Sequence, residues 1–144
     1  MTTTEQLFNK LKFLKNFLGV FPRDNLPAIK FLPVSLIMNT DPHNKPGQHW
    51  VAIHINTDSC GIYFDSYGLP PLNQEFIDYL NNNSNSWTYS KAMIQGYNSL
   101  TCGQYCALFV LLQTLGYDLF DIIHLFCTDF KTNDEIVQEF FQKL

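Results

Sequence analysis

The stretch QGYNSLTCGQYC, residues 95–106, runs without a break into ALFVLL, residues 107–112. Polar and small residues give way here to a continuous apolar run, which predicts a loop that becomes a buried helix at Cys102. The first N–H groups of a helix have no partner within the helix and carry partial positive charge, so they stabilise a thiolate at that point. Cys102 is therefore a candidate nucleophile, provided that residues elsewhere in the chain can assist it.

The composition predicts one domain, residues 1–144, with a large core. Of the 144 residues, 46% are hydrophobic and 15% aromatic, which is ample for a single core. No apolar run approaches the roughly 20 residues that cross a bilayer. Lys10, Lys12 and Lys15 interrupt the apolar residues near the start, unlike a secretory signal peptide. We therefore expect a soluble intracellular protein with reduced thiols.

Cysteine positions and charge argue against two classes of function. The spacing of Cys60, Cys102, Cys106 and Cys127 matches no zinc site, so we expect neither a metal nor another cofactor. Cys106 lies one helical turn beyond Cys102 in the apolar segment, where burial raises the pKa of a thiol, and we expect it to be structural, as we do Cys60 and Cys127. The net charge is −4 with nine basic residues, so no broad surface for nucleic acid is expected.

The remaining pattern predicts an α+β fold, with a central, mainly antiparallel sheet packed by helices and Cys102 at the N-terminus of a core helix. Strands are expected at 34–38, 49–55, 60–64 and 87–93, and the two in the middle should form an antiparallel hairpin. Helices are expected at 4–18, 73–80, 102–115, 118–127 and 133–143, with a polar loop at 81–86. Capping boxes are expected at Thr2 with Glu5 and at Thr132 with Glu135.

His49 and Asp65 fall at neighbouring ends of the expected hairpin. His49 begins the first strand and Asp65 ends the second, so antiparallel pairing would bring both side chains to one rim of the sheet. An imidazole there can act as a general base for a thiol, and a carboxylate can hold its Nδ1–H. Hydrolysis by a thiol needs such a pair, together with donors for the oxyanion.

Gln95 and two glycines complete the candidate site. Gln95 lies seven residues before Cys102, at the expected end of a strand, where its amide could join the Cys102 N–H in an oxyanion hole. Gly96 and Gly103 would keep the approach narrow and unobstructed. Taken singly, these residues have ordinary explanations: a loop histidine, a turn-forming aspartate, a solvated glutamine and a buried core thiol. Together, at these element ends, they predict a cysteine-dependent site.

The other histidines are weaker candidates for the base. His54 has the opposite strand parity to His49 and a position in the middle of its strand, which favours a packed or surface residue. His43 lies in a loop flanked by prolines, and His124 lies among apolar residues. Neither has an evident carboxylate partner nearby.

The order of these motifs resembles the adenovirus-type cysteine proteases (adenain), within the wider clan of ubiquitin-like-protein-specific proteases. It implies His49 as the base, Asp65 as the orienting acid, Gln95 as an oxyanion donor and Cys102 as the nucleophile. The adenovirus enzymes have Glu where Asp65 stands and the ubiquitin-like proteases have Asp, whereas the surrounding Phe-x-x-Tyr-Gly pattern favours the viral type. The resemblance spans most of the chain and rests on HW (49–50), FDSYG (64–68), QGYNS (95–99), CGQYC (102–106), FPR (21–23) and IMNT (37–40).

The same resemblance implies a cysteine endopeptidase that trims structural precursors, such as capsid proteins, after glycine during particle maturation in a virus, virophage or virus-like element. The enzyme would then act inside the host cell and be packaged in the virion, with Trp50 as one wall of a slot for small residues. Two alternatives remain open. One is a deconjugase that removes a ubiquitin-like modifier after its C-terminal Gly-Gly, and the other is a non-catalytic domain that only holds a glycine-ended tail.

Activation is expected to differ from that of the adenovirus protease, which is stimulated by DNA and by a disulfide-linked peptide. No cysteine falls between Asp65 and Gln95, where that peptide would attach, and the net charge of the chain is negative. We therefore expect weak or absent dependence on DNA and no covalent peptide activator.

Overall fold

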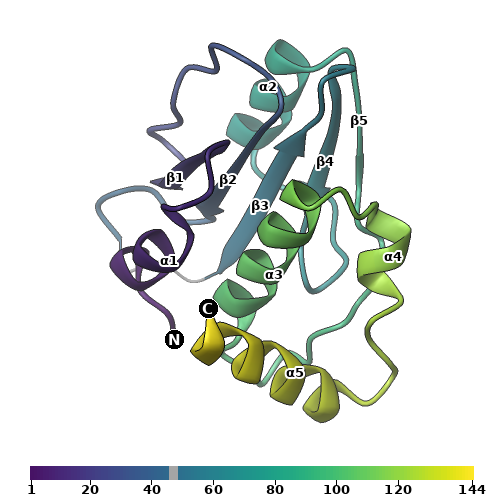
Figure 1. Ribbon diagram of the computed structural model, residues 1–144. Helices are drawn as coiled ribbons and strands as arrows, with labels where there is room; N and C mark the ends of the chain where they lie inside the picture. The colour runs from purple at the N-terminus through teal and green to yellow at the C-terminus, as the bar shows by residue number, and fades with distance from the viewer. Residues whose placement is uncertain (46–48) are drawn as a thin grey trace.

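Five strands form one sheet in the order β1–β2–β3–β4–β5 (Figure 1), in a computed structural model that describes residues 1–45 and 49–144. The expected α+β class is confirmed. The strands are β1 (Phe17–Pro22), β2 (Val34–Asn39), β3 (Trp50–Ile55), β4 (Cys60–Phe64) and β5 (Ser86–Tyr89). The helices are α1 (Thr4–Leu11), α2 (Gln74–Asn83), α3 (Cys102–Thr114), α4 (Leu119–Ile123) and α5 (Phe130–Lys143).

The sheet is mixed, and antiparallel pairing is confined to its centre. β2, β3 and β4 are antiparallel neighbours, which confirms the expected hairpin. β1 runs parallel to β2, and β5 runs parallel to β4, so the description "mainly antiparallel" fits only the middle of the sheet. The reason lies in the connections: the chain passes through α2 between β4 and β5, and a crossover of this kind returns it in the same direction.

Both faces of the sheet are buried, and alternate residues of β3 belong to two separate cores. Ala52 packs under the face that carries α1, α3 and α5, whereas Val51 and Ile53 pack under the face that carries α2. Figure 1 shows α3 lying over the middle of the sheet, with α2 behind it. The period-two pattern of β3 therefore separates two apolar layers rather than core from solvent.

The expected helix at 4–18 is wrong beyond Leu11. The chain turns after α1 and then forms β1, although Leu14 remains buried in the same core. The capping box also moves by one residue, to Thr3 with Gln6. The hydroxyl of Thr2 instead donates to Gln104 Oε1 over 2.8 Å.

Other boundaries differ by a few residues. α2 continues to Asn83, into the expected polar loop, and β5 ends at Tyr89, four residues before the expected strand end at 93. α4 is shorter than expected, and α5 starts earlier because Asp129, rather than the Thr132–Glu135 pair, caps it. Of the helices in the described ranges, none is long and apolar enough to cross a membrane.

Candidate active site

Cys102 is the first residue of α3 and faces the start of β3. Its Sγ accepts a hydrogen bond from the backbone N–H of Trp50 over 3.5 Å, and the residue is only 2% exposed. The predicted change from a polar loop to a buried helix at this residue is confirmed. The sulfur therefore lies at the start of a helix, with a backbone N–H directed at it.

His49 and Asp65 meet at one rim of the sheet, as the hairpin predicted. They directly precede β3 and follow β4, and the pairing of Ala52 with Phe64 places these strand ends side by side. His49 Nε2 lies 2.8 Å from Asp65 Oδ1. The expectation that the carboxylate holds Nδ1 is therefore wrong, because the ring presents its other nitrogen.

In this ring orientation, Nδ1 of His49 is the nitrogen that is available to the thiol of Cys102. This atom is buried and has no hydrogen-bond partner in the part of the chain that the structure describes. Burial acts to lower the pKa of His49, but the hydrogen bond to Asp65 and the charges of Asp65 and Cys102 outweigh it and raise the pKa to about 9. The imidazole is therefore protonated at neutral pH, beside the sulfur.

The carboxylate of Asp65 is fixed by its own loop. Its Oδ1 also accepts the backbone N–H of Tyr67 over 2.8 Å. The backbone of Asp65 is held by Ser90, whose Oγ accepts the Asp65 N–H at 3.2 Å and donates to the Asp65 carbonyl at 3.0 Å. Asp65 is therefore held in the position that the imidazole requires.

Tyr67 is a site residue that the sequence reasoning missed. Its ring stacks on the imidazole of His49 with the centroids 4.4 Å apart and the planes 13° apart. Tyr97 packs at an angle against Tyr67, with their ring centroids 5.1 Å apart. The only signal in the sequence was the position of Tyr67, two residues after Asp65 in the FDSYG motif.

Gln95 is fully buried, and both ends of its amide are engaged. Ser66 Oγ donates to Oε1, and Nε2 lies 3.2 Å from both the carbonyl oxygen and the Oγ of Ser99. Gln95 also lies well beyond the end of β5 rather than at a strand end, and its N–H donates to the Ser66 carbonyl. Its role as an oxyanion donor stays a prediction, and it requires an amide hydrogen to turn away from Ser99.

The two glycines pack against side chains. A Cβ on Gly103 would lie 2.7 Å from Thr2 Oγ1 and 3.1 Å from Trp50 Cδ1, so the missing side chain lets the first residues of the chain approach α3. A Cβ on Gly96 would lie 3.3 Å from the ring of Phe130. Both positions show close packing, and their expected role at the approach to the oxyanion hole stays a prediction.

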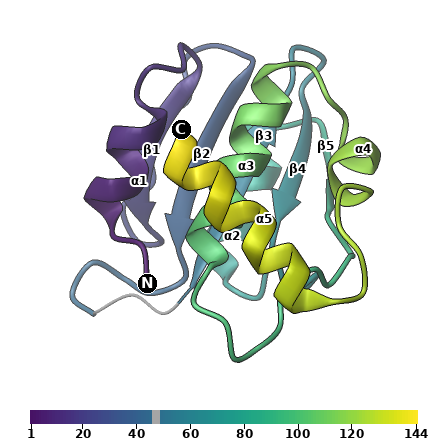
Figure 2. The same ribbon diagram turned by 60° about the horizontal axis from the view of Figure 1, so that its bottom comes forward.

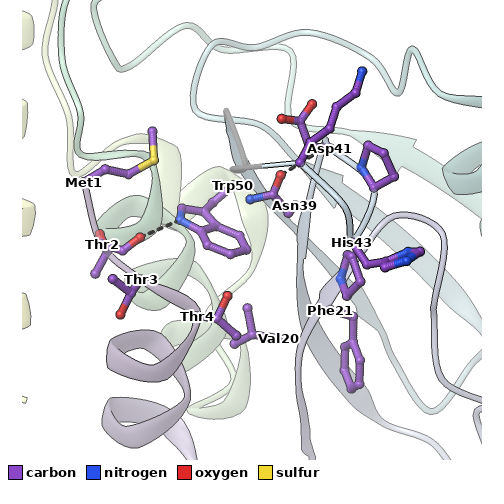
Figure 3. A pocket seen from close by; sticks show the side chains of 13 residues that line it. Met1, Thr2, Thr3, Thr4, Val20, Phe21, Asn39, Asp41, His43 and Trp50 are labelled. Carbon is purple, nitrogen blue, oxygen red and sulfur yellow. Dashed lines mark hydrogen bonds between the residues drawn. The ribbon is translucent and has the colours of Figure 1, made fainter.

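Trp50 forms one wall of a cavity of about 450 Å³ beside the site. Its ring N–H donates to the Thr2 carbonyl over 3.0 Å, and Figure 3 shows the indole between Thr2 and Asn39. A second cavity, of about 320 Å³, is lined by His49, Asp65 and Tyr67. Asp41 lines both cavities, which therefore adjoin near the loop that follows β2.

The other histidines have partners of their own. His54 is 8% exposed, contacts Ser35 Oγ at 2.7 Å, and has its pKa lowered to about 4 by burial, as a packed neutral histidine should. His43 does have a carboxylate partner, contrary to expectation: its ring and its backbone N–H both contact Asp24. This contact joins two loops that lie 19 positions apart in the chain, so neither loop alone indicates it.

All four cysteines are free thiols. Cys106 is completely buried, and burial, with the charge of Cys102 nearby, raises the pKa of its thiol well above the ordinary value. Cys60 and Cys127 lie exposed at the surface, and the structural role expected for them stays a prediction. Within residues 1–45 and 49–144, no cluster of His, Cys, Asp and Glu could hold a metal ion.

No protein-family model and no curated protein sequence matches this chain. Two crystal structures of the ASFV pS273R protease align with 95% and 94% of it, with TM-scores of 0.65 and 0.66, at 14% sequence identity. ChlaDub1 from Chlamydia trachomatis aligns with 78% of it, with a TM-score of 0.53, at 19% identity.

At these identities the likeness concerns the fold. This chain covers 66%, 65% and 58% of the three matched chains, less than two thirds of each. The adenain-like fold that the motifs implied is confirmed.

Proposed function

We propose that this chain is a cysteine peptidase in which Cys102 attacks the carbonyl carbon of a peptide bond. The observation that carries the proposal is the arrangement around His49. One ring nitrogen contacts Asp65 at 2.8 Å, and the other is buried, has no partner among the described residues, and is left for Cys102. The fold shared with the ASFV pS273R protease supports the same chemistry.

In the proposed reaction His49 moves the protons. The Cys102 thiolate adds to the carbonyl carbon, and the negative charge moves to the carbonyl oxygen. Collapse of this intermediate breaks the C–N bond, and the imidazolium of His49 gives its proton to the leaving amine. His49, now neutral, takes a proton from water, which attacks the thioester and releases the acid and the thiolate. The N–H of Cys102 and the amide of Gln95 would stabilise the oxyanion.

The proposed substrates are structural precursor proteins of a virus, virophage or virus-like element, cut after glycine during particle maturation. The cavity walled by Trp50 supports a substrate that approaches between residues 1–4 and the loop near Asn39. An enzyme of this kind would act inside the host cell and be packaged in the particle. The negative net charge agrees with the expectation that DNA is not required.

A second candidate keeps the chemistry and changes the substrate. The fold also matches ChlaDub1, a deubiquitinase, which favours release of a ubiquitin-like modifier after its C-terminal Gly-Gly. A panel of modifier–coumarin conjugates compared with glycine-ended precursor peptides separates the two candidates. Stoichiometric capture of such peptides without turnover would instead indicate a binding domain.

The test of the chemistry is a short iodoacetamide pulse at pH 6, followed by mass spectrometry of each cysteine in the wild type and in His49→Ala. The exposed thiols of Cys60 and Cys127 are built-in controls, because access alone would favour their labelling. We expect the buried Cys102 to label first, and this selectivity to vanish in His49→Ala. Slow labelling that follows exposure in both proteins would contradict the proposal.

A further inference from the structure

Two adjacent residues of α5 hold both ends of the segment that leads to Cys102. Asn133 is fully buried, and its Nδ2 donates to the carbonyl oxygen of Ile94, directly before Gln95, over 2.9 Å. At the other end, the hydroxyl of Thr101, directly before Cys102, donates to Asp134 Oδ1 over 2.8 Å. Figure 2 shows α5 lying across α3, which brings these residues to the loop.

Thr101 is the N-cap residue of α3, but it does not cap the helix. A threonine at this position ordinarily accepts a hydrogen bond from an N–H of the first turn. The Thr101 side chain makes no such bond, and its hydroxyl is turned toward Asp134 instead. The N–H groups at the start of α3 are therefore free of this cap, at the place where the reaction needs donors.

Asp134 also ends a chain of hydrogen bonds that begins at Gln95. The Gln95 amide nitrogen contacts Ser99 Oγ, and the Ser99 hydroxyl contacts that of Thr101, which donates to Asp134. An ionised carboxylate can only accept, so each hydroxyl in the chain must donate toward Asp134. Ser99 Oγ is then an acceptor for Gln95, and the amide nitrogen, rather than the amide oxygen, faces the loop before Cys102.

Tyr105 keeps the carboxylate in place. It is 1% exposed, and its hydroxyl lies 2.8 Å from Asp134 Oδ1 and 3.2 Å from the carbonyl oxygen of Ile94. Burial raises the pKa of Tyr105, and the hydrogen bond and charge of Asp134 raise it further, so the hydroxyl stays protonated and donates. Two hydroxyl donors on one oxygen fix the position of the carboxylate.

We propose that Asp134 is a positioning residue, which sets the oxyanion donors of the site through Thr101 and Ser99 without touching the substrate. This inference rests on the proposed peptidase function. It separates two properties of Cys102: attack on an amide develops an oxyanion, whereas alkylation by iodoacetamide does not. Asp134 should therefore matter for the first reaction and not for the second.

The test compares Asp134→Ala, which removes the acceptor of both hydroxyls, with Glu135→Ala, a matched change at the next, exposed residue of α5. The substrate is a coumarin amide of a peptide ending in Gly-Gly, and iodoacetamide alkylation of Cys102 is measured in parallel. For Asp134→Ala we expect kcat to fall at least about tenfold, with KM and the alkylation rate within about twofold of wild type. Glu135→Ala should match wild type in all three measurements.

Variants of Thr101 test the same hydrogen bond independently, in case the change at Asp134 impairs folding. Thr101→Val replaces the hydroxyl with a methyl group and should lower kcat as Asp134→Ala does, and Thr101→Ser should restore it. An unchanged kcat in Asp134→Ala would overturn this inference alone, as would an equal loss of turnover and alkylation, which indicates general disorder. Absence of turnover in the wild type, with Cys102 still alkylated selectively, would instead contradict the proposed function and the inference with it.

Discussion

The backbone N–H of Trp50 donates to the sulfur of Cys102 over 3.5 Å, so the residue that follows the candidate base also holds the candidate nucleophile. Trp50 is itself fixed by its ring, whose N–H donates to the Thr2 carbonyl. Gly103 leaves the space in which the ring and Thr2 meet α3. The position of the sulfur therefore depends on how the first residues of the chain pack.

Gly103→Ala should disturb this arrangement. The added Cβ would lie 2.7 Å from Thr2 Oγ1 and 3.1 Å from Trp50 Cδ1, which forces residues 1–4 and the indole to shift. We expect a loss of about 1–3 kcal/mol in the free energy of unfolding and a lower kcat. Denaturant unfolding and steady-state kinetics measure the two effects.

A second variant shows whether the clash with Thr2 is the cause. Thr2→Gly removes the contacts with Thr2 and leaves the one with Trp50 Cδ1, so Gly103→Ala should cost less in that background than in wild type. Equal costs in the two backgrounds would mean that Thr2 is not what the added methyl group meets.

Tyr67 should hold the imidazole by stacking rather than through its hydroxyl. The rings of Tyr67 and His49 are nearly parallel at 4.4 Å, and an aromatic pair contributes about 0.5–1.5 kcal/mol beyond its buried area. We therefore expect Tyr67→Ala to lower kcat/KM by about two- to tenfold, and Tyr67→Phe to change it little. A large loss in Tyr67→Phe would assign the role to the hydroxyl instead.

The sequence predicted the parts of the site that depend on local pattern. The start of α3 at Cys102 follows from a sharp change in polarity, and the meeting of His49 and Asp65 follows from the ends of one hairpin. The prediction that Nδ1 of His49 faces the carboxylate was wrong, since the choice of nitrogen depends on the rotation of one ring. Thr101 and Asp134 lie 33 positions apart, and only the docking of α5 brings them together.

The errors in the fold have a similar origin. Leucines at 7, 11, 14 and 18 have helical spacing. However, Leu14 lies in the turn after α1, and Leu18 lies in the edge strand β1. The pairing of β1 with β2 is a long-range contact, and it overrides the local helical pattern after Leu11. The sequence pattern missed the edge strand β1 and extended the other edge strand, β5, too far.

Cys102 and Cys106 should differ completely on replacement. Cys102→Ala should abolish turnover and leave peptide binding, because the nucleophile is lost while both cavities remain. Cys106→Ala should keep most of the activity and cost about 1 kcal/mol of stability, since its thiol is fully buried in the core. Turnover assays measure the activity of each variant, and fluorescence polarisation measures its binding of a labelled peptide. The reverse pattern of activity would refute Cys102 as the nucleophile.

Asp65→Asn should change both the rate and its pH dependence. The pKa of His49 is raised from 6.5 to about 9, and Asp65 contributes to this through a hydrogen bond and its charge. The imidazolium is therefore complete below pH 6.5 and is lost as the pH rises through about 9, so kcat/KM of the wild type should fall above that pH. The same raised pKa contributes folding stability below pH 6.5 that is lost over this interval.

The asparagine lacks the charge that favours the imidazolium, so the falling limb of the pH profile should move to lower pH in Asp65→Asn. The rate should also drop at least about tenfold, because the amide no longer selects the productive ring orientation. Circular dichroism checks that the fold is kept. A profile that loses rate but keeps its falling limb near pH 9 would mean that Asp65 orients the imidazole without stabilising its charge, and an unchanged rate would mean that Cys102 and His49 suffice as a pair.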